Sequence, residues 1–155
     1  MLLSVVERRQ HWAAQWTYLQ TWLLSGSGSH EDLLAGYLHS SVFSDEVLGV
    51  ASRDFHGIYK TSGIARRSYL SVTYESRWPV WERWYHDAES PLAGDVRDLF
   101  DRFTEPVQGP DLKAYRLDGK GLPVSPWQMS MLPFAEGVYV NPARQAVLVA
   151  VGMSD

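Results

Sequence analysis

Hydrophobic residues at helical spacing stand out near the start of the chain. The residues that recur at steps of 4, 3 and 4, and so share one stripe of a helix, are Trp12, Trp16, Leu19 and Leu23. Ser4 and Glu7 have the spacing of a capping box, in which each side chain bonds a free backbone N–H of the first turn. The pattern predicts a helix over 5–24. It ends at the Ser/Gly run 25–29, which we expect to be a mobile loop.

Four more segments before residue 105 have helical features. Ser29 can cap the first of them, since Glu31 and Asp32 would lie near the positive end of the helix dipole. The other three each begin with a serine or proline suited to a first turn and carry apolar residues at helical spacing. They cover 44–58, 79–85 and 90–104. In this part of the chain, the side chains of 68–76 would alternate between the two faces of a strand. The segment is also rich in β-branched and aromatic residues, which predicts a strand.

The last third of the chain has the features of strands. Residues 112–117 alternate and lead into Asp118-Gly119, which predicts a tight hairpin turn. A second hairpin is expected around 141–144, and the segment 145–151 is nearly all apolar, as in a strand covered on both faces. This order predicts an α+β fold, with helices in the N-terminal two thirds packed on a small, mostly antiparallel C-terminal sheet.

Length and composition restrict the class of protein. The chain has 155 residues, 45% of them hydrophobic, which fits a single globular domain over 1–155. It has no cysteine, which excludes disulfides, thiolate metal sites and a cysteine nucleophile. No apolar run approaches the roughly 18 residues of a membrane span, and charges soon follow the apolar N-terminus. We therefore expect a soluble cytoplasmic protein, without a membrane partner and without a cofactor.

Large aromatic side chains are frequent, with seven Trp and eight Tyr. Residues 77–85 alone contain three Trp, one Tyr and two Arg. These residue types dominate the binding energy of protein interfaces, because rigid rings fill pockets at a small entropic cost. The candidate partner-binding residues are Trp78, Trp81, Arg83, Trp84 and Tyr85. The competing interpretation places the rings in the core, and we expect it to hold for about half of them.

A locally basic stretch lies within this acidic chain, whose net charge is −4. Residues 53–83 carry six basic and three acidic groups, interleaved with aromatic residues. Such cations could pair with phosphates while the rings stack on bases, which makes nucleic acid an alternative partner. The candidate residues are Arg53, Lys60, Arg66, Arg67 and Arg77. The same composition also arises from ordinary surface arginines packed over aromatic rings.

Candidates for catalysis are few. His86 lies close to Asp87 and Glu89, and a histidine beside carboxylates can act as a general acid or base near neutral pH. The end of a helix explains the same residues better, because a cation is favoured there and acids precede the next helix. No two histidines have the spacing that puts both imidazoles on one helix face, so we predict no metal site.

No motif in the sequence specifies a function. We expect a small protein–protein interaction factor of the accessory, inhibitor or immunity type, which binds another protein through exposed aromatic and charged residues. The alternatives are a nucleic-acid-binding protein that uses 53–83 and a small metal-independent enzyme with a site at His86. Self-association as a homo-oligomer is a further option.

Overall fold

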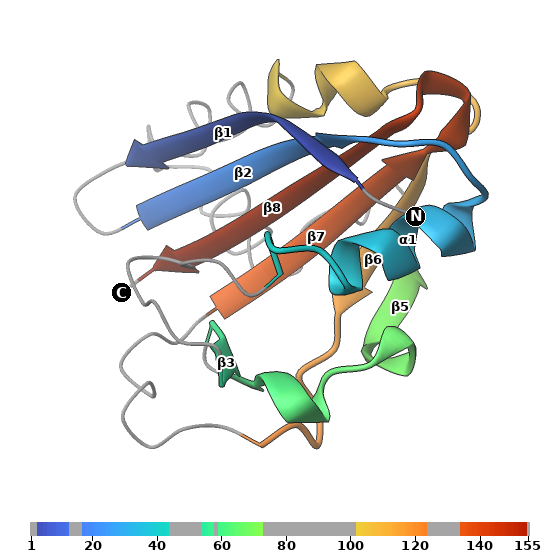
Figure 1. The fold of residues 1–155 in the computed structure, drawn as a ribbon. Helices are drawn as coiled ribbons and strands as arrows, with labels where there is room; N and C mark the ends of the chain where they lie inside the picture. The colour runs from blue at the N-terminus through green and yellow to red at the C-terminus, as the bar shows by residue number, and fades with distance from the viewer. Residues whose placement is uncertain are drawn as a thin grey trace.

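An antiparallel sheet of six strands is the main feature of the structure, a computed structural model that describes residues 3–12, 17–43, 54–57, 59–72, 102–123 and 134–154. The strand order is β1-β2-β8-β7-β6-β5, and every neighbouring pair is antiparallel (Figure 1). The strands are β1 (Ser4–Trp12), β2 (Thr17–Ser25), β5 (Tyr69–Val72), β6 (Lys113–Leu117), β7 (Phe134–Asn141) and β8 (Ala146–Ser154). A separate two-stranded ladder joins β3 (Phe55–His56) to β4 (Tyr59–Lys60).

The predicted fold class is wrong. A mostly antiparallel sheet replaces the expected set of helices packed on a C-terminal sheet, and α1 (His30–Leu38) is the only helix of seven or more residues within the described ranges. The largest error lies at the N-terminus. The helix predicted over 5–24 is instead an antiparallel pair of strands, β1 and β2.

The position of β2 inside the sheet explains that error. β2 lies between β1 and β8, and it is buried on both faces, with Trp22 and Leu24 on one face and Thr21 on the other. A strand covered on both sides loses its alternation, so its apolar residues can imitate a helical stripe. β2 is held in strand conformation by its pairing with β8 at nine residue pairs, which join segments far apart in the sequence.

The helix predicted after the Ser/Gly run 25–29 is confirmed as α1. The Ser29 hydroxyl accepts a hydrogen bond from the Asp32 N–H at 3.1 Å, and the Asp32 carboxylate accepts one from the Ser29 N–H at 3.0 Å. These bonds hold the pKa of Asp32 below its usual value. The helix buries one side against the sheet; its buried residues are Leu33, Leu34, Gly36 and Tyr37. No helix in the described ranges is long and apolar enough to cross a membrane.

Each face of the sheet carries its own hydrophobic core. On the face under α1, which we call the helix face, the buried strand residues include Trp22, Val138, Val140, Val147 and Val149. The opposite, outer face packs against the helical turn 102–104 and the 3-10 turn η3 (Glu105–Val107). Its cluster includes Phe103, Val107, Tyr139 and Leu148. The Asn141 side chain donates a hydrogen bond to the Val107 carbonyl at 2.8 Å and so ties η3 to the end of β7.

Most predictions for the last third are confirmed. β6 lies where 112–117 alternates, and β7 and β8 form a hairpin around the 3-10 turn η5 (Pro142–Arg144). Residues 146–151 are buried throughout, as expected for a strand covered on both faces. The tight hairpin predicted at Asp118-Gly119 is wrong, because β6 pairs instead with β5 and with β7, which begins only at Phe134.

The remaining elements are confirmed only in part. β5 matches the described part of the strand predicted over 68–76, and residues 102–104 at the end of the predicted helix 90–104 are helical. The helix predicted over 44–58 is wrong at its end, where Phe55 and His56 form β3. The predicted helix 79–85 lies outside the described residues, as does most of 44–58 and 90–104. Two further 3-10 turns, η1 (Thr61–Gly63) and η2 (Arg66–Ser68), connect β4 to β5.

Candidate functional site

A carboxylate is buried in the middle of the helix face. Glu136 lies on β7, two residues before the fully buried Val138, and is 2% exposed. Three side chains from three other elements bond it: His56 of β3, Tyr37 of α1 and Tyr69 of β5. The Tyr37 hydroxyl donates to Oε2 at 3.1 Å, the Tyr69 hydroxyl donates to Oε1, and the His56 Nε2 contacts Oε2. We call these four residues the Glu136 cluster.

The ring of His56 determines how protons are placed in the Glu136 cluster. Its Nδ1 lies 3.0 Å from the carbonyl oxygen of Phe43, while its Nε2 faces the carboxylate of Glu136. Since both neighbours are acceptors, two protons must be shared within this pair. They sit either on an imidazolium beside a carboxylate or on a neutral imidazole beside a protonated carboxyl. The Phe43 ring stacks on the imidazole, with ring centres 4.3 Å apart, and so excludes water from one side.

Burial and charge act in opposite directions on His56. Burial lowers its pKa, whereas the charge and the hydrogen bond of Glu136 raise it, and the net result is a pKa above the ordinary value of 6.5. Burial and the same carboxylate both raise the pKa of Tyr37 and Tyr69 well above 10. Both hydroxyls therefore stay protonated near neutral pH and keep donating to the carboxylate.

The Glu136 cluster joins elements that are far apart in the sequence. His56 and Glu136 are separated by 80 residues, and Tyr37 and Glu136 by 99. Because each of the four side chains is 2% exposed or less, they contact protein rather than solvent, and we assign them to holding α1, β3, β5 and β7 together. Among the described residues, no group of three or more acids and histidines could hold a metal ion.

Sequence reasoning missed the Glu136 cluster. The one local signal was an acid in the mostly apolar strand Phe134–Asn141, at a position that shares a face with Val138 and Val140. A charge on the buried side of a strand requires a partner. Nothing near Glu136 in the chain identifies His56 as that partner.

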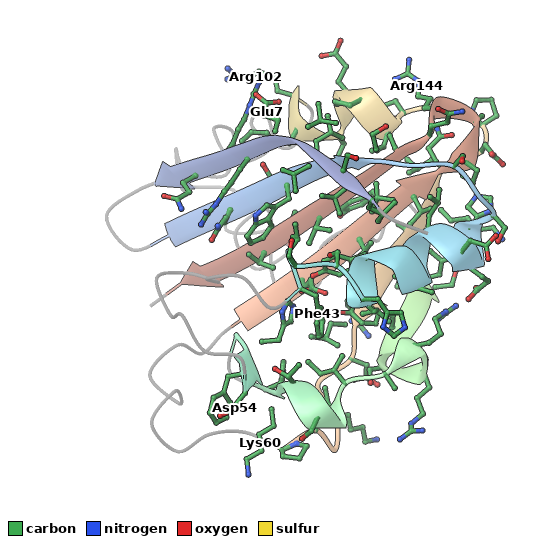
Figure 2. All side chains as sticks on the ribbon, in the orientation of Figure 1. Glu7, Phe43, Asp54, Lys60, Arg102 and Arg144 are labelled. Carbon is green, nitrogen blue, oxygen red and sulfur yellow. The ribbon has the colours of Figure 1, made fainter. Side chains whose placement is uncertain are left out.

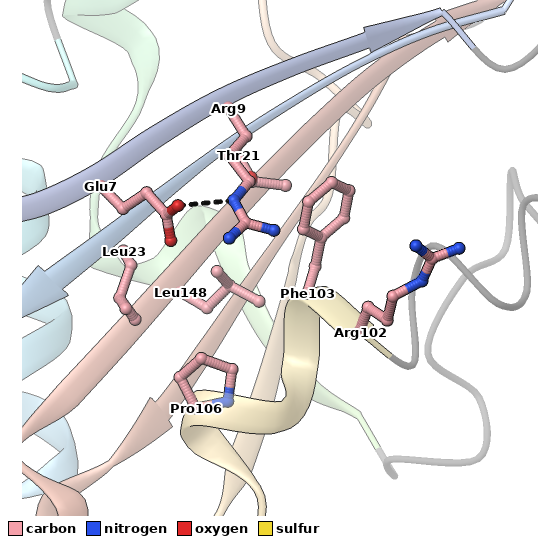
Figure 3. Close-up of a pocket in the computed structure, with 8 residues that line it drawn as sticks. All are labelled: Glu7, Arg9, Thr21, Leu23, Arg102, Phe103, Pro106 and Leu148. Carbon is pink, nitrogen blue, oxygen red and sulfur yellow. Dashed lines mark hydrogen bonds and ion pairs between the residues drawn. The ribbon is translucent and has the colours of Figure 1, made fainter.

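A shallow pocket lies on the outer face, where β1 meets the turn 102–107 (Figure 3). Its volume is about 40 Å³, which is room for roughly three water molecules. Its lining combines an apolar floor with a charged rim. The floor consists of Thr21, Leu23, Phe103, Pro106 and Leu148, and the rim of Glu7, Arg9 and Arg102. We call it the outer-face pocket.

Two arginines give the outer-face pocket its charge. Arg9 donates from Nε to the Glu7 carboxylate at 2.6 Å, and its guanidinium carbon lies 5.7 Å from the centre of the Phe103 ring. Arg102 is exposed and extends away from the floor (Figure 3), and it bonds no residue within the described ranges. Figure 2 shows Arg102 and Glu7 at the same edge of the molecule. Cations beside an apolar floor complement a ligand with acidic and apolar side chains.

Most of the predicted site residues lie outside the described residues and stay predictions. The partner-binding candidates in this group are Trp78, Trp81, Arg83, Trp84 and Tyr85. The catalytic candidates are His86, Asp87 and Glu89. Two of the five nucleic-acid candidates, Arg53 and Arg77, also belong to this group.

The structure places the three other nucleic-acid candidates, of which Arg66 is the best defined. Its guanidinium donates to both carboxylate oxygens of Glu31, at 2.6 and 2.7 Å, and to the Tyr69 carbonyl at 2.9 Å. An arginine already neutralised by a bidentate carboxylate offers little to a phosphate. Lys60 is exposed on β4, far from Arg102 in Figure 2, and Arg67 is exposed on η2.

Comparisons with known proteins show a likeness of fold. No protein-family model matches the sequence, and no curated protein sequence matches it. The crystal structure of citrus MAF1 is similar, with a TM-score of 0.50 and 12% sequence identity, over 94% of this chain and 93% of that chain. At this identity the likeness extends to the fold and not to the residues of a site.

Proposed function

We propose that this chain is a small regulatory protein that acts by binding another protein. We base this on the outer-face pocket, where Arg9 and Arg102 border a floor that includes Phe103. Arginine and aromatic side chains contribute a large share of the binding energy at protein interfaces. The likeness of fold to MAF1, a regulator protein, is compatible with this class of function.

The charges of the outer-face pocket favour a partner segment that carries an acidic residue next to an apolar one. Arg102 can donate two parallel N–H bonds to a carboxylate, because its side chain bonds no described residue. Arg9 is already paired with Glu7 and lies over the Phe103 ring, so the net positive charge of the rim is that of Arg102. The chain as a whole is acidic, so an unpaired arginine at the pocket favours an acidic segment there over most of the surface.

Selection from a displayed peptide library tests this proposal, because it requires no identified partner. Peptides are selected on the wild-type chain and then compared on Arg102→Glu, with Lys120→Glu as the control for an equal change of charge at an exposed turn. We expect enriched peptides with acidic and apolar neighbours, bound at least about tenfold more weakly by Arg102→Glu than by the control. Enriched peptides that bind both variants equally, or the absence of enrichment, would refute the pocket as the binding site.

The aromatic segment 77–85 remains a second candidate surface for the same function. If Trp81 and Trp84 contact the partner, Trp81→Ala and Trp84→Ala abolish partner capture while Tm barely changes. If both substitutions strongly lower Tm, the two rings belong to the core instead.

A further inference from the structure

β1 is an edge strand of the sheet among the described strands. Within the described part of the chain, β1 pairs with β2 alone, and its other side faces away from the sheet (Figure 1). Residues 4–10 are all exposed, and Val5 and Val6 expose 51% and 60% of their surface. Such an edge can accept another strand.

We propose that β1 pairs antiparallel with β1 of a second copy of this chain. The two-fold axis passes midway between the two Arg8 residues, which face each other. A two-fold axis perpendicular to the sheet keeps each face on its own side, so residues opposite each other must belong to the same face. One residue of β1 must therefore face its own copy across the axis. Contacts of this kind use the same surface twice and close the assembly as a dimer.

The charges of β1 select Arg8 as the residue on the axis. In this register Glu7 of each copy lies opposite Arg9 of the other, so two ion pairs cross the interface on the outer face. An axis at Glu7 or Arg9 would also place two like charges opposite each other, but it would form neither of these ion pairs to offset them. Because Glu7 and Arg9 of one copy are already bonded at 2.6 Å, the two copies would form a ring of four alternating charges.

The two Arg8 side chains on the axis point away from each other. Arg8 lies on the helix face opposite Trp22, and its guanidinium carbon is 5.9 Å from the centre of that ring. The ring belongs to β2, so this contact directs each Arg8 charge inward over its own sheet. The repulsion at the axis is thereby reduced relative to two arginines that extend across the interface.

Two features of β1 make the proposed dimer reversible rather than permanent. A β-bulge between Val5 and Glu7 interrupts the regular ladder, so the best pairing is confined to the residues around Arg8. Charges and bulges are also the means by which edge strands avoid uncontrolled pairing. The charge pattern forms two ion pairs in the register centred on Arg8 and none in the registers centred on Glu7 or Arg9.

Sedimentation velocity with charge-reversal variants tests the proposal. Glu7→Arg gives a strand with Arg at positions 7 and 9, and Arg9→Glu gives a strand with Glu at positions 7 and 9. We expect wild-type dimers between low micromolar and millimolar concentration, and self-association at least about tenfold weaker for each variant alone. A mixture of the two variants should associate again, because both pairs between positions 7 and 9 are then of opposite sign. The double variant Glu7→Arg/Arg9→Glu should also dimerise, while Lys120→Glu serves as a control away from β1.

The possible results distinguish the β1–β1 interface from an interface elsewhere on the chain. A wild-type chain that stays monomeric at millimolar concentration overturns the proposal, and so does a dimer that neither variant weakens. Failure of both the mixture and the double variant to associate overturns it as well, with circular dichroism used to confirm that each variant is folded. Glu7 and Arg9 also border the outer-face pocket, but sedimentation of the chain alone involves no partner protein, so its result does not depend on the function proposed for that pocket.

Discussion

Replacing Glu136 tests how much the buried carboxylate contributes to stability. Glu136→Leu keeps a side chain of similar volume on the helix face, but it leaves the Tyr37 and Tyr69 hydroxyls and the His56 Nε2 without their acceptor. Each buried donor that loses its partner costs about 1–3 kcal/mol, and removing one member of a buried charged pair typically costs about 3–5 kcal/mol in total. We expect a loss of about 3–5 kcal/mol, which is a large part of the roughly 5–15 kcal/mol that stabilises a domain.

Glu136→Gln removes the negative charge of the side chain while it keeps its shape. The amide can donate to the Nε2 of a neutral His56, while its oxygen still accepts from Tyr69. Because a hydrogen bond to a charged group is worth about 1.5–3 kcal/mol and a neutral one about 0.5–1.5 kcal/mol, we expect a smaller loss of about 1–2 kcal/mol. The order of stability should therefore be wild type, then Gln, then Leu.

The pH dependence of the difference between wild type and Glu136→Gln has a definite sign. In the wild type the folded pKa of His56 is raised above 6.5, so this stabilisation is fully present below pH 6.5 and is lost as the pH rises through the raised value. In Glu136→Gln, burial acts without the carboxylate and lowers the pKa of His56, so its contribution grows as the pH rises. The gap between the two proteins should therefore be smallest in alkali. It should widen as the pH falls through the raised pKa of the wild type, and continue to widen below pH 6.5 until the lowered pKa of the variant is reached.

Urea unfolding followed by far-UV circular dichroism at several pH values measures both effects. Glu105→Leu is the matched control, because it removes an exposed carboxylate and should change the unfolding free energy by less than about 0.5 kcal/mol. If Glu136→Leu costs less than about 1 kcal/mol, the desolvated network is refuted. A gap that widens as the pH rises would refute the raised pKa of His56.

Three further predictions concern local geometry. Ser29→Ala removes the cap of α1 and should cost about 1 kcal/mol in urea unfolding, whereas Ser27→Ala should have no effect. Gln145 has a φ of 52°, so Gln145→Gly should relieve strain and raise the unfolding free energy by about 1 kcal/mol; a decrease would show that the side chain matters more. A Cβ on Gly119 would overlap the Tyr59 hydroxyl and ring, so Gly119→Ala should lower Tm, and Tyr59→Leu should restore part of the loss. An unchanged Tm in Gly119→Ala would refute that contact.

Features that depend on neighbours in the chain could be predicted from the sequence. The capping box of Ser29 joins residues three positions apart, and the turn 141–144 is held by a bond from the Arg144 N–H to the Asn141 side chain at 3.3 Å. The apolar run after this turn identified a strand covered on both faces. Side-chain bonds to nearby backbone and the φ preferences of proline act over a few residues, so the local sequence is sufficient to predict them.

The fold class and both surfaces of interest depended on contacts between distant segments. Residues 5–12 and 17–24 form strands because β2 bonds β8, more than a hundred residues away, and a sheet edge at β1 exists only once that sheet has formed. The partner of Glu136 is likewise set by the packing of β3 on the helix face. Apolar spacing records which residues prefer burial, but it does not record which segment covers them, and the free energy of that choice comes from the assembled sheet and its two cores.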